Sequence, residues 1–144
     1  MKVLVQRCDK ASVSIDNKVV GSIGKGMMIL VSFTHTDTME NIDYMVDKVL
    51  NLRIYDDESG IMNKSILDTK GSILSISQFT LYADTKKGRR PSYINALNGQ
   101  KAILLYDEFN QKLKEHINVE TGIFGAEMKV ELVNDGPVTI MLEK

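Results

Sequence analysis

The polar side chains of residues 77–81, Ser77-Gln78-Phe79-Thr80-Leu81, interrupt an otherwise apolar segment. A serine or threonine hydroxyl becomes a nucleophile near neutral pH only when a base activates it. If the segment is a strand, Ser77 and Phe79 share one face while Gln78 and Thr80 share the other. Buried polar groups need partners, so the segment either bonds neighbouring backbone groups or lines a ligand site. Its spacing fits both interpretations.

A conventional hydrolytic site would place a histidine beside a nucleophile, and the chain contains two histidines. His35 follows a predicted strand, and His116 lies at the polar end of a predicted helix, where the helix dipole favours a positive charge. We expect surface or capping roles for both. The one cysteine, Cys8, is expected to be a small buried hydrophobe. These three residues are too few for a structural zinc site, so we expect no metal and no cofactor.

A second unusual segment is Asn134-Asp135-Gly136-Pro137, which has the composition of a hairpin turn because asparagine, aspartate and glycine tolerate positive φ. Pro137 is out of place in such a turn. It cannot donate a ladder hydrogen bond, so we expect it where the neighbouring carbonyls project away from the sheet. On its own the segment is interpreted as a turn, and the sequence does not show whether the Gly136–Pro137 bond is cis.

Most elements that must position these residues are predicted strands. The chain begins with residues 2–6 and a hairpin of residues 11–15 and 19–23 around Asp16-Asn17. The apolar run 27–33 is too short for a typical helix and is expected to be a strand buried on both faces. Four further segments are interpreted as strands: residues 52–55, 72–82, 128–133 and 138–142.

Two amphipathic helices are also predicted. The first begins at Asp37 or Thr38, where Glu40 is placed to complete a capping box, and runs to Leu50. The second covers residues 99–116 and carries an apolar stripe at helical spacing. The expected fold class is therefore α+β, with a curled, largely antiparallel β-sheet or barrel carrying two helices. No linker or repeat divides the sequence, so we expect a single domain over residues 1–144.

Composition narrows the function classes. Hydrophobic residues make up 43% and charged residues 26% of the chain, as in folded globular proteins. The net charge of -1 gives no general attraction to nucleic acid, so contact with phosphate would need a local patch such as the basic loop of residues 86–90. Alternatively, this basic loop is only solvated and contacts no phosphate. No apolar run approaches the length of a membrane span or signal core, and we expect a cytoplasmic protein without membrane contact.

Taken together, the motifs resemble the D-aminoacyl-tRNA deacylase family, and they occur in that family's order along the whole chain. The matching segments are Ser77-Gln78-Phe79-Thr80-Leu81, residues 83–85 and 88–92, Asn134-Asp135-Gly136-Pro137-Val138-Thr139, residues 5–7, 11–13 and 121–124. The resemblance implies a barrel-like homodimeric hydrolase that proofreads translation. It would cleave the ester of D-aminoacyl-tRNA, and of mischarged glycyl-tRNA, while rejecting L-aminoacyl-tRNA. Its partner would be the 3′ end and acceptor stem of tRNA.

The resemblance also implies roles for residues. The catalytic segment would be Ser77, Gln78, Phe79 and Thr80, lining the pocket around the ester and the terminal adenosine. Phe124 would contact the adenine, and Arg7 would brace the loop of Gly136 and Pro137. These last two, forming a Gly-cisPro motif, would enter the pocket of the partner subunit and leave no room for an L side chain.

Because the sequence offers no evident base for Thr80, we favour a reaction assisted by the 2′-hydroxyl of the terminal ribose. Backbone N–H groups near Phe79 and Thr80 would stabilise the oxyanion. Two rival functions are a non-catalytic RNA-binding or interaction module, and a peptidase or ordinary esterase. The complete motifs oppose the first, and the missing histidine-based nucleophile opposes the second.

Overall fold

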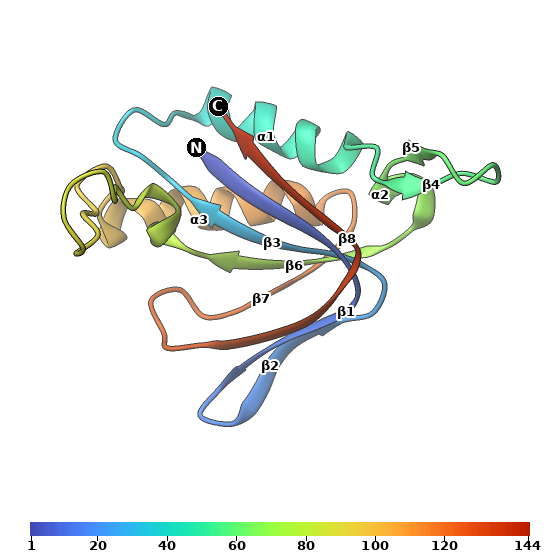
Figure 1. The fold of residues 1–144 in the computed structure, drawn as a ribbon, viewed down its shortest axis with the longest axis horizontal. Helices are drawn as coiled ribbons and strands as arrows, with labels where there is room; N and C mark the ends of the chain where they lie inside the picture. The colour runs from blue at the N-terminus through green and yellow to red at the C-terminus, as the bar shows by residue number, and fades with distance from the viewer.

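The computed structural model describes residues 1–144 and has a six-stranded sheet at its centre (Figure 1). The path of hydrogen-bonded neighbours is β2-β1-β3-β6-β7, and β8 pairs with β1. β1 is antiparallel to β2, β3 and β8, whereas β3–β6 and β6–β7 are parallel, so the expected curled sheet is mixed. Its strands are β1 (Lys2–Ile15), β2 (Lys18–Ile23), β3 (Gly26–Ser32), β6 (Ser72–Ser77), β7 (Asn118–Thr121) and β8 (Lys129–Glu143).

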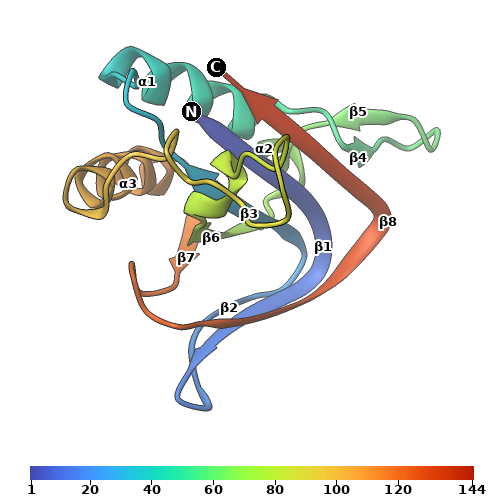
Figure 2. The same ribbon diagram turned by 60° about the vertical axis from the view of Figure 1, so that its left-hand side comes forward.

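The curl of the sheet comes from β1 and β8, which pair over most of their length and bend together (Figure 2). The first half of β1 also pairs with β3, and its second half pairs with β2. The tight turn of the β1–β2 hairpin was predicted at Asp16-Asn17. Both residues have left-handed backbones, with φ of 49° and 62°, which suits a two-residue hairpin turn.

Two clusters of apolar side chains cover the two faces of β3. Met27, Ile29 and Val31 belong to the larger core, which the amphipathic helices α1 (Met39–Asn51) and α3 (Gly99–Lys114) close. Met28 belongs to a smaller core inside the curl, together with residues of β1, β2 and β6. Alternate side chains of a strand face opposite ways, so the continuous apolar run is buried on both faces, as predicted.

The end of β6 differs from the prediction. Residues 72–82 were expected to form one strand, but β6 ends at Ser77 and Phe79–Tyr82 forms the 3-10 helix η1. The pairing of β6 with β3 ends at Val31 and Ser77, and β3 itself stops at Ser32, so the following residues have no ladder partner. The expected alternation of Ser77 and Phe79 against Gln78 and Thr80 is therefore wrong.

The C-terminal hairpin was also predicted wrongly. Residues 128–133 and 138–142 belong to one strand, β8, which pairs antiparallel with β1. The residues that looked like a turn form a bulge, because Gln6 pairs with Thr139 while Cys8 pairs with Asn134. The Asn134 side chain spans this bulge, donating from Nδ2 to the backbone oxygens of Arg7 at 2.9 Å and Val138 at 3.0 Å.

Shorter elements were missed or misplaced. Residues 52–54 are not a strand, and only β4 (Tyr55–Asp56) forms there, pairing with β5 (Met62–Lys64) in a separate two-stranded ribbon. The short helix α2 (Ile66–Thr69) and β7 were not predicted. Both are four residues long, so neither shows a hydrophobic period in the sequence.

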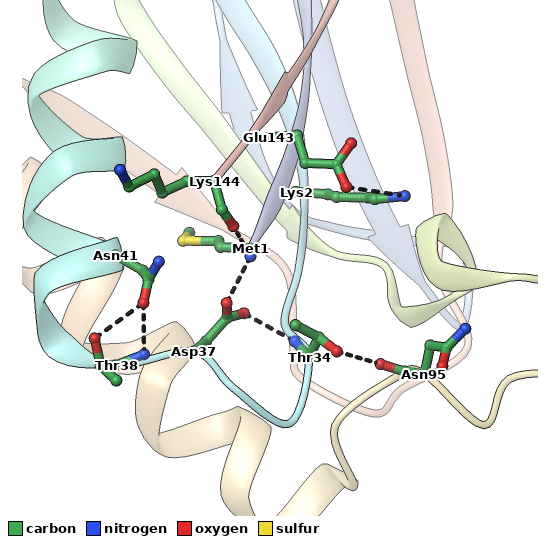
Figure 3. Close-up of polar contacts among 9 residues, drawn as sticks. All are labelled: Met1, Lys2, Thr34, Asp37, Thr38, Asn41, Asn95, Glu143 and Lys144. Carbon is green, nitrogen blue, oxygen red and sulfur yellow. Dashed lines mark hydrogen bonds and ion pairs between the residues drawn. The ribbon is translucent and has the colours of Figure 1, made fainter.

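The start of α1 lies beside both chain ends (Figure 3). Thr38 is the N-cap, and its N–H donates to Asn41 Oδ1 at 2.9 Å, so Asn41 rather than Glu40 completes the capping box. Asp37 is not the cap. Its carboxylate accepts from the buried Met1 ammonium at 2.6 Å and from the Thr34 N–H at 2.8 Å. Met1 N also donates to the backbone oxygen of Lys144 at 2.6 Å. None of the helices has the length and apolar character that a membrane span requires.

Candidate active site

A pocket of about 600 Å³ opens where β3 and β6 end, and its lining is mostly apolar. The volume falls within the roughly 300–1,000 Å³ of small-molecule sites. Four of the predicted site residues line it: Ser77, Gln78, Phe79 and Phe124. The lining contains no histidine, acid, lysine or arginine. The pocket therefore provides hydroxyl, amide and aromatic groups, but no conventional general base.

Gln78 and Phe79 are fixed by the turn that ends β6. The Gln78 N–H donates to Val31 O at 2.8 Å, which adds one bond to β3 before the chain turns away. Phe79 is 55% exposed, and its ring contacts the Tyr93 ring edge-on, with the ring centres 5.0 Å apart. Because aromatic pairs of this geometry are favourable, the two rings form a stable wall at the mouth of the pocket.

Thr80 does not line the pocket. It lies in η1, and its hydroxyl accepts a hydrogen bond from the Gln78 Nε2 group. Since a helical turn rather than a strand follows Gln78, Thr80 reaches the pocket only through the Gln78 amide. The structure thus groups Thr80 with the predicted catalytic segment in a supporting position.

Phe124 lines the pocket from the connection between β7 and β8. Its ring packs against the buried Tyr106 of α3, with the ring centres 5.8 Å apart. The Tyr106 hydroxyl donates to Ser75 O at 2.7 Å, and burial raises the pKa of Tyr106 above its ordinary value. A neutral, hydrogen-bonded tyrosine therefore fixes the aromatic ring that the family resemblance assigns to the adenine.

The predicted roles of the histidines agree with their positions, because neither lines the pocket. His35 Nε2 lies 2.9 Å from Ile94 O, and the neighbouring Thr34 hydroxyl donates to Asn95 O at 2.7 Å. Together with the hydrogen bond from the Leu97 N–H to Phe33 O at 2.9 Å, these contacts hold residues 93–98, which include Tyr93, against the end of β3. His116 is exposed beyond the end of α3.

Cys8 is only 2% exposed and also lies outside the pocket. Burial raises the pKa of its thiol to about 11. The nucleophilic form of cysteine is the thiolate, so the thiol stays protonated and inert near neutral pH. The expectation of a small buried hydrophobe is confirmed.

Arg7, Gly136 and Pro137 form a separate cluster at the bulge of β8. The Arg7 Nε group lies 2.9 Å from Asp135 Oδ2, and its Nη1 group donates to Ile54 O at 2.6 Å. Arg7 thereby braces the residues next to the Gly136–Pro137 peptide bond, which is cis. Both Gly136 and Pro137 are exposed.

This cluster does not line the pocket of its own subunit. Arg7 also faces Asp56 of β4, at 3.8 Å. In Figure 1, β4 lies on the opposite side of the molecule from the yellow segment that carries residues 93–98. Within one chain, the predicted site residues therefore form two groups: the pocket with Phe124, and the bulge with Arg7.

Sequence reasoning missed most of the pocket lining, including Tyr93 and Ser32. Tyr93 belongs to a segment without periodicity, where the Asn98 side chain caps α3 by accepting from the Lys101 N–H at 3.1 Å. That cap was the available signal that an ordered segment ends there. Ser32 is 2% exposed and its hydroxyl has no partner. Its place at the end of the apolar run 27–33 could have marked it as a polar group facing a cavity.

Comparison with known sequences gives one family and several relatives of nearly the same length. The family model described as "D-Tyr-tRNA(Tyr) deacylase" matches residues 4–143. A D-aminoacyl-tRNA deacylase of Bacillus velezensis is 56% identical over 99% of this chain and 98% of its own. The corresponding protein of Listeria monocytogenes is 57% identical over 99% and 95%, and that of Clostridium kluyveri is 53% identical over 99% and 97%.

Two solved structures share the fold. One, described as "c-Myc DNA Unwinding Element Binding Protein", has a TM-score of 0.95 and 39% identity, covering 100% of this chain and 99% of its own. The other, described as a probable eukaryotic D-amino acid tRNA deacylase, has a TM-score of 0.84 and covers 98% and 97%. At 20% identity, the second comparison concerns the fold alone.

Proposed function

Since the chain belongs to the D-Tyr-tRNA(Tyr) deacylase family and is an ester hydrolase acting on D-aminoacyl-tRNA, we propose that it cleaves the ester in the pocket walled by Ser77, Gln78 and Phe79. The observation that carries this proposal is the combination of that segment with a lining free of acids, lysine, arginine and histidine. The proposed reaction therefore activates water with a group of the substrate rather than with a side chain of this lining.

In the proposed reaction the 2′-hydroxyl of the terminal ribose helps to activate water. The water attacks the ester carbonyl, the bond from the carbonyl carbon to O3′ breaks, and the 2′-hydroxyl relays the proton from the water to O3′. The protein contributes orientation and electrostatic stabilisation. Phe79 and Thr80 begin η1, and the first N–H groups of a helix have no intrahelical acceptor. These N–H groups stabilise the oxyanion, while Thr80 holds the Gln78 amide through the hydrogen bond between their side chains.

Phe124 receives the adenine of the terminal adenosine in this proposal. Exposed bases stack on aromatic side chains, and the contact with Tyr106 keeps the Phe124 ring in one position. The Phe79 and Tyr93 rings, which contact each other, then flank the aminoacyl end. The pocket would thus hold the adenosine and the ester in a fixed relation.

Selection against L-amino acids is assigned to Gly136 and Pro137 of a partner subunit in a homodimer. The support is their position, because the bulge is exposed and lies apart from the pocket of its own chain. Carbonyl groups of this segment accept from the substrate ammonium and occupy the space that an L side chain would need. D-residues and glycine lack a side chain in that direction, so glycyl-tRNA is also a substrate.

Contact with the remainder of the tRNA is assigned to the basic loop of residues 86–90. This loop is exposed and contains Lys86, Lys87, Arg89 and Arg90. Cationic side chains bind phosphates by releasing counterions, which makes such binding dependent on salt. The loop would contact the acceptor stem, and the protein would act on tRNA in the cytoplasm.

A deacylation assay with four substrates tests the proposal. We expect hydrolysis of D-tyrosyl-tRNA and glycyl-tRNA, with L-tyrosyl-tRNA and a simple ester unaffected. Loss of L-tyrosyl-tRNA at the same rate would overturn the chiral selection, and hydrolysis of the simple ester alone would indicate an ordinary esterase. Replacing Lys86, Lys87, Arg89 and Arg90 by alanine should reduce the salt dependence of tRNA binding, whereas an unchanged salt slope would exclude the loop.

A further inference from the structure

The bulge of β8 contains residues that no ladder hydrogen bond to β1 holds in place. Between the two ladder pairs that flank the bulge, Arg7 alone lies opposite residues 135–138. A common β-bulge sets only two residues against one. Gly136 and Pro137 occupy the middle of the segment, and both are exposed. Their position therefore depends on contacts other than the ladder between β1 and β8.

The Asn134 side chain closes the base of the bulge. Its Nδ2 group donates to Arg7 O at 2.9 Å and to Val138 O at 3.0 Å, so it links β1 to the far end of the bulge. Its Oδ1 atom accepts from the Thr139 hydroxyl at 3.1 Å and from Gln6 Nε2 at 3.4 Å. A carboxamide offers two N–H donors and two lone pairs on its oxygen. Because all of these are used, the amide is held in one orientation.

Arg7 fixes the same segment from the side of β1. Its Nε group lies 2.9 Å from Asp135 Oδ2. A Cβ atom added at Gly136 would lie 3.2 Å from Arg7 Nη2, so the guanidinium group packs against the glycine backbone. The two ends of the segment are thus both fixed, Asp135 by the Arg7 side chain and Val138 by the Asn134 amide.

The surroundings of this network indicate that it contributes more to the shape of the bulge than to folding. Thr139 is exposed, and Gln6 and Asn134 are half-buried. Losing a hydrogen bond costs most where a buried group is left without a partner, whereas water can reach these side chains. The network holds the one segment of β8 that combines exposed backbone with missing ladder partners.

We propose that Asn134, oriented by Gln6 and Thr139, is a positioning residue for the selection against L-aminoacyl-tRNA, an inference that rests on the proposed function. In that function, the carbonyl groups of Gly136 and Pro137 occupy the space that an L side chain would need. Such exclusion fails when the excluding atoms can move aside, so its strength depends on how firmly the bulge is held. Asn134 acts through the bulge and needs no contact with the substrate.

The test compares kcat/KM for D-tyrosyl-tRNA and L-tyrosyl-tRNA. Asn134→Asp keeps the size of the side chain but places an acceptor oxygen against Arg7 O and Val138 O. We expect this variant to raise kcat/KM for L-tyrosyl-tRNA roughly tenfold, the order of two lost hydrogen bonds, while kcat/KM for D-tyrosyl-tRNA changes by less. A purely structural role would instead lower both values in parallel.

Variants of Thr139 test whether the orientation of the amide matters. Thr139→Val keeps the shape of the side chain but removes the donor to Asn134 Oδ1. We expect it to raise kcat/KM for L-tyrosyl-tRNA by roughly threefold, since one hydrogen bond is lost. Thr139→Ser keeps the hydroxyl and should keep the wild-type ratio of D to L hydrolysis. Glu131→Ala, an exposed change on β8 outside the bulge, should also keep it.

The outcomes separate this inference from the proposed function. If the wild-type protein hydrolyses neither substrate, or both at equal rates, the proposed function itself fails. It also fails in its assignment of the selecting segment if Gly136→Val leaves both activities unchanged. If Gly136→Val alters hydrolysis, but Asn134→Asp and Thr139→Val keep the wild-type ratio of D to L hydrolysis, only the positioning role is overturned. Thr139 is exposed, so Thr139→Val keeps the test valid even if Asn134→Asp impairs folding.

Discussion

At the scale of single residues, replacing Thr80 distinguishes the reaction assisted by the 2′-hydroxyl from one in which the Thr80 hydroxyl is the nucleophile. Its hydroxyl bonds to Gln78 and does not line the pocket. We therefore expect Thr80→Ala to lower the single-turnover rate on D-tyrosyl-tRNA by about tenfold or less, the value of one hydrogen bond of ~1 kcal/mol. Removal of the ribose 2′-hydroxyl should cost ~10²–10⁴-fold, as loss of a general base does. Thr80→Ser, which keeps the hydroxyl, is the matched control. An inactive Thr80→Ala variant with an unaffected deoxy substrate would contradict the assisted reaction.

Cys8 gives a prediction about alkaline stability. Its pKa is raised from 9.0 to about 11 by burial, so the unfolded chain loses the thiol proton at lower pH than the folded chain. The protonated Cys8 thiol therefore contributes to the free energy of unfolding. This contribution is fully present below pH 9 and is lost as the pH rises toward 11, at up to ~1.4 kcal/mol per pH unit. Urea unfolding of the wild type and Cys8→Ala between these values should show a shallower decline in the variant. If the free energies of unfolding of the two proteins decline in parallel, groups other than Cys8 cause the loss of stability at alkaline pH.

At the scale of elements, residues 93–98 are held by three hydrogen bonds from the segment that follows β3, and two of these use side chains of that segment. Thr34→Val removes the donor to Asn95 O, and His35→Ala removes the contact with Ile94 O. Because these contacts position the segment that carries Tyr93, we expect the double variant to raise KM for D-tyrosyl-tRNA several-fold, an amount consistent with ~1 kcal/mol per hydrogen bond. His116→Ala is the control, since His116 is exposed and contacts neither wall. Equal KM values in all three proteins would show that the segment needs no such support.

The sequence predicted elements with an uninterrupted pattern well, whereas the two longest strands, β1 and β8, were each predicted as two separate strands. The strand 27–33 and both amphipathic helices were located within a few residues. The sequence-based prediction failed where contacts with another segment, or a single side-chain hydrogen bond, determine the course of the backbone. The turn after Ser77 follows from β3 ending at Ser32, which is a long-range fact, and the Asn134 side chain keeps β8 continuous through a segment with turn composition.

The candidate site was predicted through motif resemblance more than through physical pattern. Ser77, Gln78, Phe79 and Phe124 do meet in one pocket. Tyr93 and Ser32 were not foreseen, because a cavity wall has no periodic signature in the sequence. The position of Thr80 was also missed, because the sequence does not show that β6 ends at Ser77.

At the scale of the whole molecule, two groups of site residues at separate places predict complementation between subunits. Gly136→Val disturbs the bulge, because a Cβ there would lie 2.8 Å from Val138 Cγ2 and φ is 116°. Phe79→Ala combined with Gln78→Leu disables the pocket. Each variant alone should lose D-specific hydrolysis, and a mixed dimer of the two should regain one working pocket. A mixed dimer as inactive as its parents would contradict the partner-supplied gate.

The ends of the chain also contribute to the stability of the whole fold. The Met1 ammonium and Asp37 side chain are 0% and 2% exposed and lie 2.6 Å apart. Removing one member of a buried pair leaves an uncompensated charge, so Asp37→Ala should lower the free energy of unfolding by about 3 kcal/mol. Asp43→Ala, which breaks a 60% exposed pair with Lys112, should cost less than about 1 kcal/mol. Equal losses in thermal or urea unfolding would refute the role of the buried pair.

The pocket lining without acids, lysine, arginine or histidine has a wider consequence. If the reactive hydroxyl arrives with each aminoacyl-tRNA, D and L substrates bring the same chemistry with them. Selectivity for D-aminoacyl-tRNA then depends on which aminoacyl group can enter the pocket and not on the rate of the chemical step. The rate of hydrolysis and its selectivity can therefore change independently. Reagents that trap activated serine or histidine would find no target in the pocket, so such an enzyme would remain unlabelled in a survey of hydrolases based on those reagents.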